Sequence, residues 1–228
     1  MNTIVITDLT RFSEGKTIVC IAGIEVTTGE CIRPVPYLEK STCEKYKILP
    51  GTILSGEFSM PSSIEKPHTE DRKYKNMMNN GFCGLAEFRN ILERSASNNV
   101  HEGFNTDLGY SQKKLLEDYE GEKSIITIQL NPKDLSIVKD KYGKITVHFM
   151  DSSGRSFQYL PITDLGFHDY AMFKNGIENL DSLNKFINSQ DELFLRIGLT
   201  RLYQGYYWMQ VNGIYTFPNY LQDIRSYG

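Results

Sequence analysis

The order of the segments rich in β-branched residues constrains the fold more than any other feature of this sequence. Four such segments open the chain: "NTIVITDLTRF", "KTIVCIAGIEV", "GECIRPVPYL" and "GTILSGEFSM", the last spanning Gly51–Met60. β-Branched and aromatic side chains favour strands, and "TTG" at Thr27–Gly29 supplies a turn. The start of the chain is therefore predicted to be a strand meander with short connections.

A second group of strands follows Asn131-Pro132. The segment "LSIVKDKYGKITVHFMDSSGRSFQYLPI" predicts three strands, with turns at Tyr142-Gly143 and Ser152–Gly154. Glu178–Glu192 has apolar residues at helical spacing and predicts an amphipathic helix. Two strands, "LFLRIGLT" and "YYWMQVNGIYTF", come last. Three strands, a helix and two more strands is the order of a five-stranded oligonucleotide/oligosaccharide-binding (OB) barrel.

The polar segment Pro61–Gly121 separates the two groups and is longer than ordinary connections between strands. Within it, Leu85–Ala96 and Ser111–Glu120 predict short helices, and a strand is expected at Lys123–Asn131. We therefore expect a mostly β protein with inserted helices, built as two tandem OB-like β-barrels. The first would span residues 1–131 with a helical and loop insertion at about 61–121, and the second residues 132–228 with a helix at about 178–192.

The charge balance and the motifs narrow the function classes. The chain has 25 Lys and Arg against 28 Asp and Glu, which argues against tight, sequence-independent binding of duplex DNA. No apolar run approaches the roughly 20 residues of a membrane span, and the start lacks a secretory leader, so we expect a cytosolic protein. The cysteines form no C-x-x-C pair and no phosphate-loop or dinucleotide motif occurs, so neither a metal nor a cofactor is expected.

The C-terminal strand carries the clearest candidate binding residues. Its two-residue period would place Tyr207, Met209 and Val211 in the core, and Tyr206 and Trp208 on the opposite face. Aromatic rings can stack on nucleobases, and an arginine can stack or contact phosphate. The candidate ligand contacts here are Arg201, Tyr206, Trp208 and Tyr215. The alternative is that these side chains fill a barrel core.

Two further motifs add candidate residues. In "CIRPV" the proline holds Arg33 in extended backbone at a strand end, where its guanidinium could bind a phosphate or remain in a salt bridge. "PHTED" concentrates His68, Glu70 and Asp71, which could supply a general base and carboxylates to an enzyme. A loop of this composition could also simply be solvated or cap a helix.

The combination of "IAGIEVTTGECIRPV", "PHTED" and "LRIGLTR…YYWMQVNGIYTFPNYL" resembles the dual-OB domain proteins, a bacterial family. The resemblance covers nearly the whole chain, and its most specific part is Trp208–Pro218. It implies two tandem OB-like barrels and a role with nucleic acid or nucleotides.

The favoured hypothesis is non-enzymatic binding of single-stranded nucleic acid or a nucleotide-like ligand in a groove between or on the barrels. The expected ligand contacts are Arg33, His68, Arg201, Tyr206, Trp208 and Tyr215. One alternative is an enzyme that processes nucleotides or nucleic acid through His68, Glu70 and Asp71. Another is a protein-interaction module with a protein partner. No membrane partner is expected, and the oligomeric state stays open.

Overall fold

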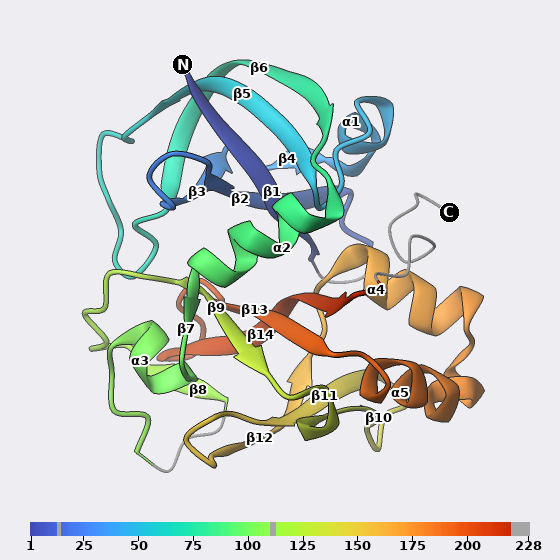
Figure 1. Ribbon diagram of the computed structural model, residues 1–228. Helices are drawn as coiled ribbons and strands as arrows, with labels where there is room; N and C mark the ends of the chain where they lie inside the picture. Colours follow the sequence, from blue (N-terminus) through green and yellow to red (C-terminus); the bar gives the residue numbers. More distant parts are fainter. Residues whose placement is uncertain (13–14, 110–112, 220–228) are drawn as a thin grey trace.

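The computed structural model describes residues 1–12, 15–109 and 113–219, and shows a mostly β protein with two OB-like units (Figure 1). The N-terminal unit is a closed barrel, because its strands pair in the order β1-β5-β6-β3-β2 and β2 pairs again with β1. Among the described strand pairs of this barrel, only β3–β6 is parallel. The strands are β1 (Asn2–Arg11), β2 (Ile18–Glu25), β3 (Cys31–Val35), β5 (Thr52–Ser59) and β6 (Asp71–Phe82), with β4 (Leu38–Glu39) and α1 (Lys40–Lys45) beside them.

The C-terminal unit is a half-barrel made of two sheets around one core. The larger sheet has the order β7-β9-β13-β14-β8, and the smaller one the order β10-β11-β12. A bridge between Ile162 and Val211 links the two sheets. The strands are β7 (Ala96–Ser97), β8 (Lys114–Leu116), β9 (Ile125–Leu130), β10 (Leu135–Lys139), β11 (Ile145–Met150), β12 (Ser156–Pro161), β13 (Glu192–Leu199) and β14 (Tyr206–Phe217).

Short helices connect and cover these sheets. Between the units lies α2 (Leu85–Arg94). The C-terminal unit contains α3 (Val100–Phe104), the 3-10 turn Pro132–Asp134, α4 (Leu165–Asp169), the π-helical turn Tyr170–Lys174, the 3-10 turn Ile177–Asn179 and α5 (Leu180–Asn188). The helices predicted at Leu85–Ala96 and Glu178–Glu192 are therefore confirmed, each ending a few residues earlier than expected. Among the described residues, no helix is long and apolar enough to cross a membrane.

The segment predicted as an insertion, Pro61–Gly121, differs most from expectation. Its residues Asp71–Phe82 form β6, a full strand of the first barrel. Of these twelve residues only Arg72 is buried. Because the strand has no buried face, its sequence needs no alternation of apolar and polar residues, and none is present. The helix predicted at Ser111–Glu120 is wrong, because Lys114–Leu116 form β8 and pair with β14; Ser111 itself lies outside the described residues.

The strand expected at Lys123–Asn131 also changes its partners. Since β1 and β2 close the first barrel, no free edge remains there, and β9 pairs instead with β13 of the second sheet. The strand pairing thus changes between Phe82 and Ala96 rather than at residues 131–132. The division into domains of residues 1–131 and 132–228 stays a prediction about folding units.

The two units are packed tightly together. Helix α2 crosses between them (Figure 1), and its Phe88 and Leu92 share a buried cluster with Val5 of the first barrel and Phe194 of the second unit. The backbone N–H of Arg11 donates to the carbonyl of Thr163 at 2.8 Å. These contacts hold the walls of any site between the units in a fixed arrangement.

Candidate functional site

A pocket of about 800 Å³ lies between the two units, and we call it the inter-barrel pocket. The first barrel contributes residues of β1, β2 and β3, and the second unit contributes the end of β13, the start of β14 and the segment after β12. Four of the six predicted ligand contacts line it: Arg33, His68, Arg201 and Trp208. The sequence places these residues far apart, and the fold brings them to one cavity.

Arg33 reaches the pocket from β3 with only 4% of its surface exposed. Its Nε donates to Asp71 Oδ1 at 2.5 Å, and its Nη1 donates to Ser124 Oγ at 3.2 Å. The Asp71 contact follows from the parallel pairing of β3 with β6, which sets these two residues opposite each other. Nη2 has no hydrogen-bond partner among the described residues. A buried donor without a partner costs about 1–3 kcal/mol, so this atom calls for an explanation.

Asp71 joins the two arginines of the pocket. Its Oδ2 accepts from Arg201 Nη2 at 2.5 Å while Oδ1 accepts from Arg33. Burial alone would raise the pKa of Asp71, but Arg33 and Arg201 together lower it below the ordinary value. Arg201 keeps 38% of its side chain exposed and also donates to the Tyr37 hydroxyl at 3.3 Å. One guanidinium is therefore buried in the pocket wall, and the other lies at its open side.

His68 is 1% exposed, and its ring packs edge-on against Tyr207 with 6.0 Å between ring centroids. Neither ring nitrogen makes a hydrogen bond of standard geometry among the described residues, although the Thr200 backbone lies near enough to favour the protonated form slightly. Burial first, and then the charges of Arg33 and Arg201, lower the pKa of His68 to about 3. The ring is neutral at physiological pH and offers one donor and one acceptor.

Glu70 has a structural role, unlike its neighbours His68 and Asp71 in "PHTED". Its Oε1 accepts from the backbone N–H groups of Ser124 at 2.6 Å and Ile125 at 3.0 Å, and its Oε2 accepts from Ser124 Oγ at 2.9 Å. The carboxylate therefore fixes the start of β9 to the first barrel. His68, Glu70 and Asp71 do not converge on one point, since one carboxylate holds backbone and the other holds arginines.

Trp208 is half-buried and marks the aromatic side of the pocket. Its Nε1 donates to the carbonyl of Tyr203 at 3.2 Å, which fixes the plane of the indole. From the first barrel, Phe12 and Tyr37 also line the pocket, with 5.1 Å between their ring centroids. The pocket thus combines aromatic faces with arginine and histidine side chains.

The two-residue period of the last strand holds only over its first half. Tyr207, Met209 and Val211 are buried, as predicted. From Val211 onward every residue of β14 is buried, because this half of the strand lies between the two units. Tyr215, predicted as a ligand contact, does not line the inter-barrel pocket: it is 0% exposed, donates to the Thr7 carbonyl and packs edge-on against Phe88.

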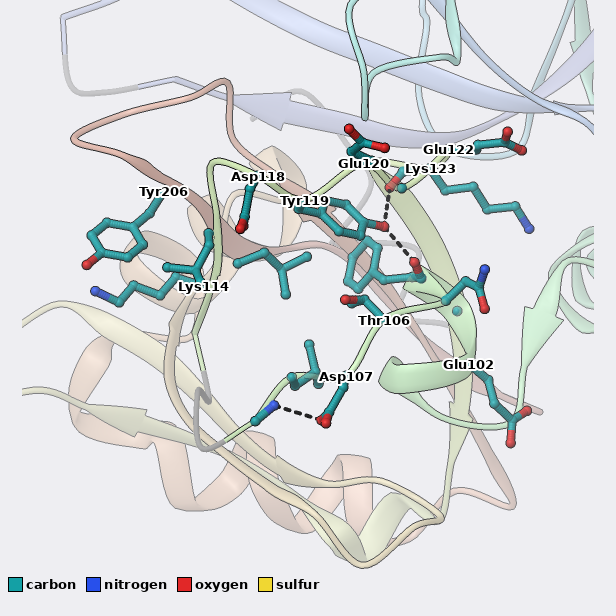
Figure 2. Close-up of a pocket in the computed structure, with 18 residues that line it drawn as sticks. Glu102, Thr106, Asp107, Lys114, Asp118, Tyr119, Glu120, Glu122, Lys123 and Tyr206 are labelled. Atoms are coloured by element: carbon teal, nitrogen blue, oxygen red, sulfur yellow. Dashed lines mark hydrogen bonds between the residues drawn. The ribbon is translucent and has the colours of Figure 1, made fainter.

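Tyr206 lines a different cavity, of about 1020 Å³, shown in Figure 2. Its ring lies under the Lys114 ammonium, 3.3 Å from Nζ to the ring centroid. Acidic side chains surround this second cavity: Glu102, Asp107, Asp118, Glu120 and Glu122. Such a lining is unsuited to an anionic ligand, and the described residues contain no group of three or more His, Cys, Asp and Glu that could hold a metal ion.

Several pocket residues escaped the sequence-based prediction. Asp8 is the clearest case, because an acidic residue inside the apolar run "TIVITDLT" signals a buried charge. Its Oδ2 accepts from Arg196 Nε at 2.9 Å, while its Oδ1 has no hydrogen-bond partner among the described residues. Other lining residues missed are Thr10, Phe12, Tyr37, Thr163, Gln210 and Asn212. Their positions follow from the docking of the units, which no local pattern shows.

Comparison with known proteins adds the family. Residues 4–214 match the family described as "Dual OB-containing domain", which agrees with the closed barrel and half-barrel of the structure. No curated protein and no solved structure matches the chain. Because the match covers most of the sequence, this chain belongs to the dual OB-containing domain family.

Proposed function

We propose that the protein binds a nucleotide-like ligand, free or as part of a single strand, in the inter-barrel pocket and performs no chemistry on it. The observation that carries the proposal is the composition of this one cavity: buried polar atoms of Arg33 and His68 without hydrogen-bond partners among the described residues, beside the side chain of Trp208. A nucleotide offers hydrogen-bonding groups, an aromatic face and a phosphate together. A volume of about 800 Å³ is also in the range of small-molecule sites.

The electrostatics support a small ligand or a short strand rather than a long duplex. Arg33 and Arg201 share the carboxylate of Asp71. Arg201 also pairs with Glu65 at 3.6 Å, so little positive charge is left over. Binding through phosphates alone requires several unpaired cationic side chains, and its affinity falls steeply with added salt. We therefore expect affinity that falls only modestly with added salt.

The chemistry of the "PHTED" motif favours binding over catalysis. A general base works best when its pKa lies near the working pH, and the pKa of His68, at about 3, is far below it. Both carboxylates of "PHTED" are already engaged, by backbone N–H groups and by arginines. No observation specifically favours a protein-interaction module, and the cytosolic location stays a prediction.

The test uses Trp208, which is the only tryptophan of the chain. Its fluorescence should be quenched when nucleotides or short single strands of DNA or RNA are titrated into the protein, because the ring would stack on a base. Trp208→Ala should lower the affinity measured by calorimetry by about 1–3 kcal/mol with little change in melting temperature. Mononucleotides and oligonucleotides run side by side distinguish a free nucleotide from a strand.

The matched control is Tyr142→Ala, since this aromatic side chain is 74% exposed in a turn away from the pocket. It should leave both affinity and melting temperature unchanged. The proposal fails if no nucleotide or single strand binds the wild-type protein. It fails equally if Trp208→Ala lowers the melting temperature while the folded fraction binds as before.

A further inference from the structure

The most buried polar side chains of the inter-barrel pocket share one property. Asp8 is 1% exposed, Arg33 4% and His68 1%, and all three line the cavity. Each has a buried atom without a hydrogen-bond partner among the described residues: Asp8 Oδ1, Arg33 Nη2, and both ring nitrogens of His68. We call these three residues the deep end of the pocket, and the more exposed Arg201 its mouth.

The unpaired atoms of the deep end form a mixed set of donors and acceptors. Asp8 Oδ1 can only accept a hydrogen bond, Arg33 Nη2 can only donate, and neutral His68 can do one of each. A phosphate dianion only accepts hydrogen bonds, so it could satisfy Arg33 but would be repelled by Asp8. The edge of a nucleobase carries donors and acceptors side by side and could satisfy all three residues.

The charges of the deep end are already balanced within the protein. Asp8 is paired with Arg196, Nη2 to Oδ2 at 2.8 Å, and Arg33 with Asp71, Nε to Oδ1 at 2.5 Å. Glu70 adds a further negative charge near Arg33. A ligand charge placed here would be unpaired and desolvated, which is costly, whereas a neutral polar edge would not. Leu199 and Ile162, both buried, supply apolar wall for the faces of a ring.

We infer that the pocket takes its ligand base first: the hydrogen-bonding edge of a neutral nucleobase meets Asp8, Arg33 and His68, and the phosphate stays at the mouth beside Arg201. This inference rests on the proposed function and adds the orientation of the ligand and the part that is recognised. Its consequence is that the base and not the phosphate supplies most of the affinity. The ligand class is therefore nucleosides and nucleotides, rather than phosphate esters in general.

The experiment compares ligands that divide a nucleotide into parts, by calorimetry on the full-length wild-type protein. The probes are adenosine, guanosine, cytidine and uridine, their 5′-monophosphates, ribose 5-phosphate and inorganic phosphate. At least one nucleoside should bind within about tenfold of its monophosphate, and ribose 5-phosphate should bind at least about 100-fold more weakly than that monophosphate. The inference is overturned if ribose 5-phosphate binds as tightly as the monophosphate, or if the nucleosides do not bind.

Three variants separate the deep end from the mouth. His68→Leu removes both hydrogen-bonding atoms and should lower nucleoside affinity about tenfold or more, and His68→Gln, which keeps a donor and an acceptor, should retain more of it. Arg201→Gln should weaken the monophosphate by a larger factor than the nucleoside. Equal nucleoside binding by wild type and His68→Leu, with the folded state verified by circular dichroism, would overturn the inference.

The outcomes also separate this inference from the proposed function. If the monophosphates or single strands bind but no nucleoside does, the protein is a nucleotide binder that holds its ligand by the phosphate, and only the base-first orientation falls. If nothing in the series binds, and single strands do not bind either, both proposals fall together.

Discussion

Arg196 and Arg33 are two buried arginines at the same interface between the units, and they differ in one respect. Arg196 donates through Nε to Asp8 at 2.9 Å, through Nη1 to Thr127 at 2.8 Å and through Nη2 to Cys31 Sγ at 3.3 Å. Arg33, whose side chain lines the inter-barrel pocket, donates through Nε and Nη1 only, and its Nη2 has no hydrogen-bond partner among the described residues. Every side-chain nitrogen of Arg196 donates a hydrogen bond within the protein, whereas one nitrogen of Arg33 donates none among the described residues.

The difference indicates which buried charge serves stability and which serves binding. A buried arginine with all its donors satisfied resembles any other interior polar network, and its loss leaves an unpaired charge behind. A buried arginine with an unsatisfied N–H donor lowers the stability of the fold, and a ligand that accepts a hydrogen bond from it removes this cost. The same reasoning separates Glu70, whose carboxylate is fully engaged, from His68, whose ring nitrogens make no hydrogen bond of standard geometry among the described residues.

The largest expected effect is the contrast in stability between Arg196→Met and Arg33→Met. Removing Arg196 leaves Asp8 buried without its countercharge, which should lower the free energy of unfolding by about 3–5 kcal/mol. Removing Arg33 should cost about 1–3 kcal/mol, because Asp71 keeps its contact with Arg201. Urea denaturation followed by circular dichroism measures both. Equal losses would break the comparison.

A smaller effect concerns the dependence of stability on pH. The pKa of His68 is near 6.5 in the unfolded chain and about 3 in the folded protein. Burial and the charges of Arg33 and Arg201 lower the folded value, and Asp71 partly opposes them. Between these values the unfolded chain binds a proton that the folded chain does not, so stability falls as the pH drops from about 6.5 towards 3. The His68 contribution to the slope is at most about 1.4 kcal/mol per pH unit.

His68→Gln tests that contribution, because it lacks the titrating group. Urea denaturation at pH 7, 6, 5 and 4 should show a smaller loss of stability in the variant than in the wild type. His148, whose pKa is also lowered by burial and by Lys113, is unchanged in both proteins and therefore cancels in the comparison. Parallel pH profiles for the two proteins would show that His68 is not held neutral by the fold.

The order of β-branched segments was enough to predict two OB-like units, because strand-forming residues act locally. It failed for β6 (Asp71–Phe82), whose long exposed face carries no apolar period, and for β8 (Lys114–Leu116), where pairing with β14 overrides helical spacing. Tyr215 was named a ligand contact for its aromatic ring, although the two-residue period sets it on the same face as Tyr207, Met209 and Val211, and it is buried like them.

The candidate site was predicted as a set of residues but not as a geometry. Arg33, His68, Arg201 and Trp208 meet in one pocket, yet Asp71 contacts Arg33 across 38 positions of the chain and Arg201 across 130. These contacts depend on the parallel β3–β6 pair and on the docking of the two units. Neither leaves a local pattern in the sequence. Asp8, by contrast, could have been found, because it is an acidic residue inside an apolar run.

The central claim is that the free edge of Arg33 belongs to a ligand, and Arg33→Lys tests it most directly. Lysine keeps the positive charge beside Asp71 but cannot reproduce the planar guanidinium edge. The measurement is a titration of Trp208 fluorescence in wild type and variant with the nucleotide that the wild type binds best. We predict about a tenfold loss of affinity with less than about 1 kcal/mol loss of stability. An unchanged affinity in the folded variant would contradict the account.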